Sequence, residues 1–170
     1  MITFSGYRLS PLQQSMLAEA TEFVLDYYMS KRLKNSLCID IHIVKDMYEK
    51  EKTWGDVDVE DDGESSPKYY TVRLNYSGIV SFYKTLEVLV HEMIHVKQYA
   101  KRELKHLRKP WHVSFMKTHY NTMLVPYYER PWEAEAHGLE RYLTEKFLKK
   151  SQRVNSYVQR KSDVTYMQEL

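Results

Sequence analysis

Two stretches of the chain alternate regularly between apolar and polar residues. Isoleucine occupies every second position from residue 39 to residue 43 within residues 37–45, and residues 69–76 repeat the alternation with tyrosine, valine and leucine. A period of two is typical of a β-strand that buries one face. The sequence therefore predicts two half-buried strands. His42 falls on the polar face of the first strand, which favours a sheet-surface residue over a metal ligand.

Other stretches space their apolar residues three and four positions apart, which indicates amphipathic helices. Ser10, Pro11 and Gln13 suit the start of the first helix as a capping box, and Pro110 should stop the second. The expected helices cover residues 10–33, residues 81–85 to about 108, a short segment at 111–121, and a long segment that begins at Pro131. Strands and helices in this order predict an α+β fold, with a small sheet packed on the second helix.

The remaining segments are polar. Residues 46–68 are rich in acidic residues, glycine and serine, and we expect a long connection there with a short strand around Val57 and Val59. Their acidic spacing is not that of a calcium loop. Ser77 and Gly78 should turn the chain. Residues 1–150 are expected to form one domain, and residues 151–170 a polar, peripheral C-terminal tail.

Composition narrows the class of protein only slightly. The chain has 170 residues, a net charge of +2 and one cysteine, so no internal disulfide can form. No basic and apolar leader and no apolar run of membrane-spanning length is present, which predicts a cytoplasmic protein. A basic run from Lys97 to Lys109 is most simply the solvated end of a helix. Binding of nucleic acid through that run is a weaker expectation, because no aromatic residues are interleaved with it.

The chemistry concentrates in the sequence His91-Glu92-Met93-Ile94-His95, which reads H-E-x-x-H. On a helix, positions i and i+4 share one face, so both imidazoles can reach one ion. Glu92 points beside that ion, where it can take a proton from a water molecule that the metal activates. The alternative is a chance pair of helix histidines. The surrounding apolar helical pattern is the context that a metal site requires, and it favours the metal.

A zinc ion held in this way usually needs a third protein ligand. His112, Glu133 and Glu135 follow the motif at suitable separations. Glu133 and Glu135 lie two positions apart on the expected helix and therefore face different directions, so only one of them can reach the ion.

The spacing His91-Glu92-x-x-His95-x-x-Gln98, followed by Pro131-Trp132-Glu133-Ala134-Glu135-Ala136, resembles short zincin-type metallopeptidases of bacteria and their viruses. It is also similar to the wider gluzincin group, and the resemblance covers about residues 69–150. It implies that Glu133 is the third zinc ligand. In gluzincins an Asp four residues later orients a ligand histidine, whereas this chain has His137 there.

A weaker resemblance points to SprT-like proteins, in which a histidine after the motif is the third ligand. His112-Val113-Ser114-Phe115 is similar to that segment, although it lacks the usual neighbouring glycine and its aromatic residue comes one position early. This resemblance implies His112 as the ligand and a nucleic-acid-associated protease.

We therefore predict a zinc metallopeptidase that binds Zn²⁺ through His91, His95 and Glu133 and uses Glu92 as general base on a peptide or protein substrate. Residues 69–76 are predicted to be the edge strand that pairs with substrate. The donor to the oxyanion is expected among four residues: Tyr127, Tyr128, His112 and His137. The alternatives are a zinc ion that only staples two helices, and the SprT-like module.

Overall fold

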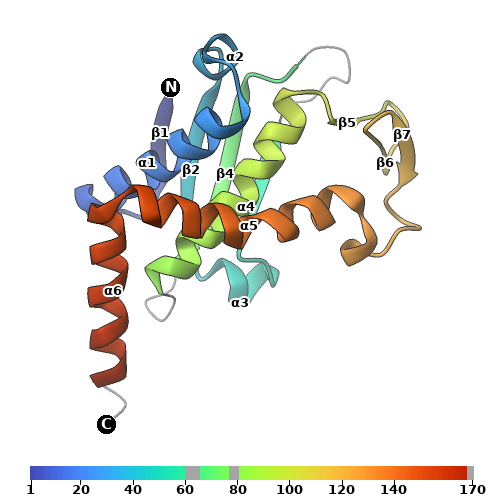
Figure 1. Ribbon diagram of the computed structural model, residues 1–170. Helices are drawn as coiled ribbons and strands as arrows, with labels where there is room; N and C mark the ends of the chain where they lie inside the picture. The colour runs from blue at the N-terminus through green and yellow to red at the C-terminus, as the bar shows by residue number, and fades with distance from the viewer. Residues whose placement is uncertain (60–65, 77–80, 168–170) are drawn as a thin grey trace.

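The computed structural model describes residues 1–59, 66–76 and 81–167, with side chains described up to residue 160. It confirms the predicted α+β class, with a mixed four-stranded sheet, a small antiparallel sheet and six helices in the described part of the chain (Figure 1). The predictions for residues 60–65 of the acidic connection and for the turn at Ser77 and Gly78 lie outside the described residues.

The larger sheet has the strand order β1-β2-β4-β3. Strands β1 (Ile2–Gly6), β2 (Cys38–Lys45) and β4 (Tyr69–Tyr76) run parallel, and β3 (Gly55–Val59) is antiparallel to β4. The alternation that predicted β2 and β4 is confirmed, because their apolar residues are buried on one face. The expected short strand at Val57 and Val59 is β3.

One correction concerns the edge of this sheet. The sequence predicted residues 69–76 as the edge strand, but β4 pairs with β2 on one side and with β3 on the other. The prediction was wrong because β3 is short and polar, and alternation in β4 says nothing about its neighbours. The edge that lies beside the H-E-x-x-H helix is therefore β3.

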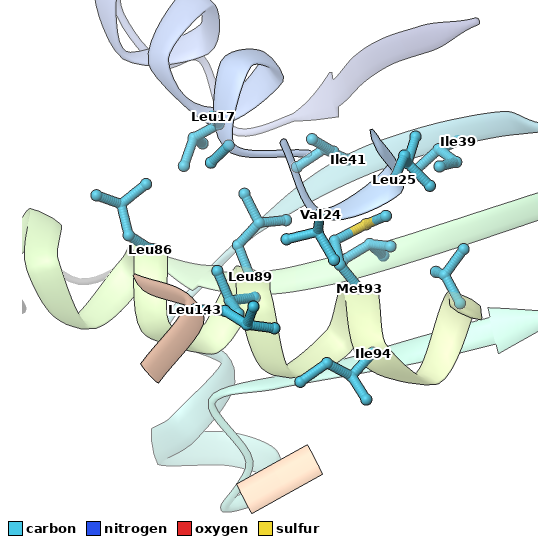
Figure 2. Close-up of a cluster of buried hydrophobic side chains, with 14 of the residues drawn as sticks. Leu17, Val24, Leu25, Ile39, Ile41, Leu86, Leu89, Met93, Ile94 and Leu143 are labelled. Carbon is cyan, nitrogen blue, oxygen red and sulfur yellow. The ribbon is translucent and has the colours of Figure 1, made fainter. Parts of the chain in front are cut away.

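Helix α4 (Phe82–Ala100) carries the H-E-x-x-H motif and packs on the apolar face of the sheet. Ser81 caps it by accepting a hydrogen bond from the backbone N–H of Lys84. Figure 2 shows side chains of α1 (Pro11–Tyr28), β2 and α4 meeting in one core. The labelled members of that core are Leu17, Val24, Leu25, Ile39, Ile41, Leu86, Leu89, Met93, Ile94 and Leu143.

Helix α5 (Pro131–Lys150) crosses α4 and covers its other side (Figure 1). Its predicted start at Pro131 is confirmed. The first predicted helix is divided, because the chain leaves helical geometry at Met29 and Ser30 caps a separate short helix, α2 (Lys31–Asn35). The capping box of Ser10 and Gln13 is present at the start of α1.

The segment after α4 differs most from the prediction. The helix ends at Ala100 rather than near Arg108, and Arg102 has a φ of 61°, which turns the chain out of the helix. The predicted short helix at 111–121 is wrong: this part of the chain forms β5 (Leu104–His106), β6 (His112–Phe115) and β7 (Thr118–Asn121). Met116 and Lys117 both have positive φ and form the two-residue turn between β6 and β7.

Three further elements complete the described part of the chain. They are the helix α3 (Met47–Glu51), the 3₁₀ turn η1 (Tyr127–Glu129) and the helix α6 (Gln152–Met167). The sequence predicted a polar tail where α6 lies. Val154 and Val158 of α6 are buried, and Tyr157 packs edge-on against Phe82. No helix in the described ranges is long and apolar enough to cross a membrane.

Candidate metal centre

Two histidines of α4 and one carboxylate of α5 converge between the helices. His91 and His95 lie one helical turn apart, and their Nε2 atoms are 3.2 Å from each other. Glu133, in the first turn of α5, places its Oε2 atom 3.6 Å from Nε2 of His91 and 3.3 Å from Nε2 of His95. All three side chains are buried. The sequence-predicted trio is thus brought together, although it comes from segments about forty residues apart.

The other nitrogen of each imidazole is held by an oxygen. Nδ1 of His91 lies 2.6 Å from Oε2 of Glu140, and Nδ1 of His95 lies 2.8 Å from Oε1 of Gln98. Because both oxygens accept hydrogen bonds, each imidazole carries its proton on Nδ1. In its neutral form each imidazole would therefore present the lone pair of Nε2 toward the other ring and toward Glu133.

Gln98 is itself fixed by a buried polar network. Its amide nitrogen donates to the backbone oxygen of Trp132 at 3.0 Å and to Oε2 of Glu135 at 2.8 Å. Oε1 of Glu135 accepts a hydrogen bond of 2.7 Å from Lys97, a side chain that is only 4% exposed. Glu135 therefore supports Gln98 and pairs with Lys97, and the contacts of its two oxygens leave Glu133 as the carboxylate that faces the histidines.

The electrostatics of the cluster are strongly shifted. Burial alone would lower the pKa of His91, but interaction with Glu133 and Glu140 outweighs it and raises the pKa to about 9. Burial also tends to lower the pKa of His95, but the contact with Glu133 outweighs burial and raises that pKa. Against the effect of burial, the two histidines hold the pKa of Glu133 well below its usual range. Each group is thus stabilised in its charged form by the others, and a metal ion bound here would have to displace the protons at Nε2 of the two histidines.

Glu92 lies beside this cluster and is 5% exposed. Burial raises its pKa to about 7, against the opposing pull of His95 and His91. Gly55 of β3 makes room for it: a Cβ atom at position 55 would lie 3.0 Å from Oε1 of Glu92 and 2.6 Å from Cγ1 of Val88. The carboxylate therefore occupies a space that the missing side chain of Gly55 leaves open.

The other candidate residues lie in different places. His91, Glu133 and His137 each offer one ligand atom within 4.8 Å of the other two and form a group that could hold a metal ion. The trio with His95 is tighter, with no separation above 3.6 Å, and we give it more weight. His137 is exposed, and its Nδ1 lies 3.3 Å from Glu140. His112 lies on β6, with Nδ1 2.9 Å from the oxygen of Pro110, away from the trio.

Two cavities open on either side of His91 and Glu92. One, of about 400 Å³, is also lined by Lys52, Trp54, Lys84, Tyr128, His137 and Glu140. The other, of about 230 Å³, is also lined by Asp56, Val57, Tyr99, Leu104, Trp132 and Glu133. Thr53, Gly55 and Tyr127 line both. Both cavities are therefore lined by the edge strand β3 and by residues of the cluster, and His112 lines neither cavity.

The residues fit a tetrahedral zinc ion. Ligand atoms about 2.0 to 2.2 Å from zinc lie roughly 3.3 to 3.6 Å apart in such a site, which agrees with the three separations found here. Oε2 of Glu133 is buried and has no hydrogen-bond partner among the described residues. A buried carboxylate oxygen without a partner is costly, and a cation would satisfy it.

Three residues make contacts at the site that the sequence did not predict. Glu140 contacts His91 in the way that the gluzincin pattern would lead one to expect of an Asp, but it lies seven residues after Glu133 rather than four. It shares a helix face with Glu133, and that spacing is the signal that could have found it. Gln98 and Glu135 belong to the motif pattern found in the sequence, but that pattern did not predict that Gln98 contacts both His95 and Glu135.

Comparison with known proteins adds no relative. No family model matches the chain, and no curated protein and no solved structure does either. The class that fold and site define is therefore an α+β protein with a buried His/Glu group that could bind a metal ion.

Proposed function

We propose that the protein is a zinc-dependent metallopeptidase of the zincin type, in which His91, His95 and Glu133 bind the ion. The observation that carries the proposal is the convergence of their three ligand atoms, with separations of 3.2 to 3.6 Å, next to the buried Glu92. A site that only stapled two helices would need neither Glu92 nor two cavities that reach the cluster.

When bound, zinc supplies a Lewis acid that activates water and polarises a carbonyl. Glu92 is placed to accept a proton from the attacking water and to return it to the leaving amine. Its burial and shifted pKa suit a base that works near neutral pH. Glu140 and Gln98 keep the two imidazoles in the tautomer that leaves Nε2 without a proton.

The substrate's main chain is proposed to pair with β3, the edge strand whose Gly55 lines both cavities. Tyr127 is the best placed of the four expected donors to the oxyanion, because it lines both cavities and interacts with Glu133. Tyr128 and His137 line only one cavity. The SprT-like alternative depends on His112 as ligand, and the position of His112 on β6 disfavours it.

Two measurements test this proposal. Zinc content is measured after dialysis for the wild type and for Glu133→Ala, Glu135→Ala and His112→Ala, and we expect more than about 100-fold weaker zinc binding for Glu133→Ala alone. Hydrolysis of an unfolded protein is then compared between the wild type and Glu92→Gln. We expect zinc to be retained and turnover to fall by at least about 1000-fold.

The alternatives make opposite predictions. A structural zinc staple would show no hydrolysis by the wild type and would tolerate Glu92→Gln. A SprT-like site would lose zinc in His112→Ala and keep it in Glu133→Ala. Either result would overturn the proposal.

A further inference from the structure

The two cavities beside His91 and Glu92 differ in charge. The larger one is lined by Lys52 and Lys84, whereas the smaller one has no lysine or arginine among its lining residues and contains Asp56. The acidic residues of the larger cavity are already engaged: Glu140 accepts from His91, and Glu92 lies at the buried base. Lysine side chains therefore distinguish the larger cavity from the smaller one.

Lys52 is held in place by aromatic rings. It ends α3 in a left-handed conformation, with φ of 59°, and its Nζ lies 5.8 Å from the centre of the Tyr48 ring. That ring stacks on Trp54 at 4.2 Å. Within the described residues no carboxylate lies within ion-pair distance of Lys52. The ammonium of Lys52 therefore lies near an aromatic stack, and Trp54 of that stack lines the cavity.

Lys84 approaches from the first turn of α4. Its Nζ is 2.7 Å from Oε2 of Glu87, a residue that does not line the cavity. Against the effect of burial, the contact with His91 and the charges of His137 and Lys84 lower the pKa of the Glu140 carboxyl. Lys84 therefore adds positive potential on the α4 side of the cavity, while Lys52 adds it on the α3 side.

We propose that this cavity is a subsite for an anionic group of the substrate, near the bond that is cut. The ligand would be an Asp or Glu side chain, or the terminal carboxylate of a peptide, held between the aromatic wall of Trp54 and Tyr127 and the two lysines. The inference rests on the proposed peptidase function, and it names acidic peptides as the preferred substrates.

The test uses the zinc-loaded full chain and matched peptides that differ only in charge. In one pair Glu is compared with Gln on either side of the cut, and in a second pair a free C-terminus is compared with an amidated one. We expect the anionic member of at least one pair to be bound and cut about five times better. The pair that responds identifies the source of the anion. Equal results for both pairs would overturn the inference.

The second part of the test reverses the charge of a lysine that lines the larger cavity. Lys52→Glu should abolish or invert the preference, whereas Lys105→Glu on β5 makes the same change in net charge away from the cavity and should leave it intact. Binding is measured by calorimetry alongside hydrolysis. Selective binding without hydrolysis would refute the peptidase and keep the subsite, whereas hydrolysis without charge preference would refute the subsite and keep the peptidase. A preference that Lys52→Glu leaves unchanged would also refute the subsite.

Discussion

The two histidines of the candidate metal centre are held by different means. His91 contacts the carboxylate of Glu140 at the rim of the larger cavity, while His95 contacts the neutral amide of Gln98, which is fully buried. A carboxylate makes its imidazole partner more electron-rich and is a strong acceptor. An amide orients the ring without adding charge. We infer that the His91 side tunes affinity for the metal, and that the His95 side fixes geometry.

The largest effect should follow from removing the charged support. Glu140→Ala leaves Nδ1 of His91 without its acceptor, and we expect zinc to bind about 10- to 100-fold more weakly. Competition with a chelating dye measures the affinity. Glu140→Gln keeps an acceptor oxygen and should recover part of the loss. Equal affinities for the wild type and both variants would show that Glu140 does not tune the site.

A smaller effect on the metal is expected on the other side. Gln98→Leu removes the acceptor for His95, and we expect about 10-fold weaker zinc binding. The same variant removes the amide donor to Oε2 of Glu135 and to the backbone oxygen of Trp132, so its thermal midpoint should also fall. If Gln98→Leu lost more zinc affinity than Glu140→Ala, Gln98 rather than Glu140 would be the stronger determinant of zinc affinity.

The smallest effect on the metal should come from Glu135→Gln. Glu135 reaches His95 only through Gln98, so zinc affinity should change less than about threefold. Lys97 loses one of its two carboxylate partners and keeps Glu103, at 2.6 Å. Because Lys97 is buried, we expect about 1 to 3 kcal/mol lower free energy of unfolding. Urea denaturation measures it, and Glu19→Gln, which removes an exposed pair with Arg153, is the control with a smaller loss.

Periodicity predicted the elements whose burial is one-sided. Strands β2 and β4 and helix α4 each place apolar residues on one face, so their sequences carried the signal. The helix pattern also placed His91 and His95 on one face, which is a local property. The approach of Glu133 to them was proposed from a resemblance between motifs, because nothing in the spacing alone fixes how α5 crosses α4.

What the sequence did not predict depends on partners distant in the chain. Strand β1 is short and partly exposed, and it is a strand because it pairs with β2. The turn at Met116 and Lys117 contains no glycine or asparagine, so nothing in the sequence signalled its positive φ values. The first part of α6 is fixed by Val154 and Val158, two apolar residues in a polar segment. In each case tertiary contacts outweigh local preference.

Gly55 has a consequence for any attempt to transplant this centre. Grafting α4 and α5 onto another scaffold would carry over the three proposed ligands and Glu92, but not the bare backbone position on the neighbouring strand. Since a methyl group there would press on both Val88 and Glu92, the recipient must supply a notch at that point in its sheet. The working unit is thus two helices and one strand with a gap in it, and the H-E-x-x-H motif alone is an incomplete specification of the centre.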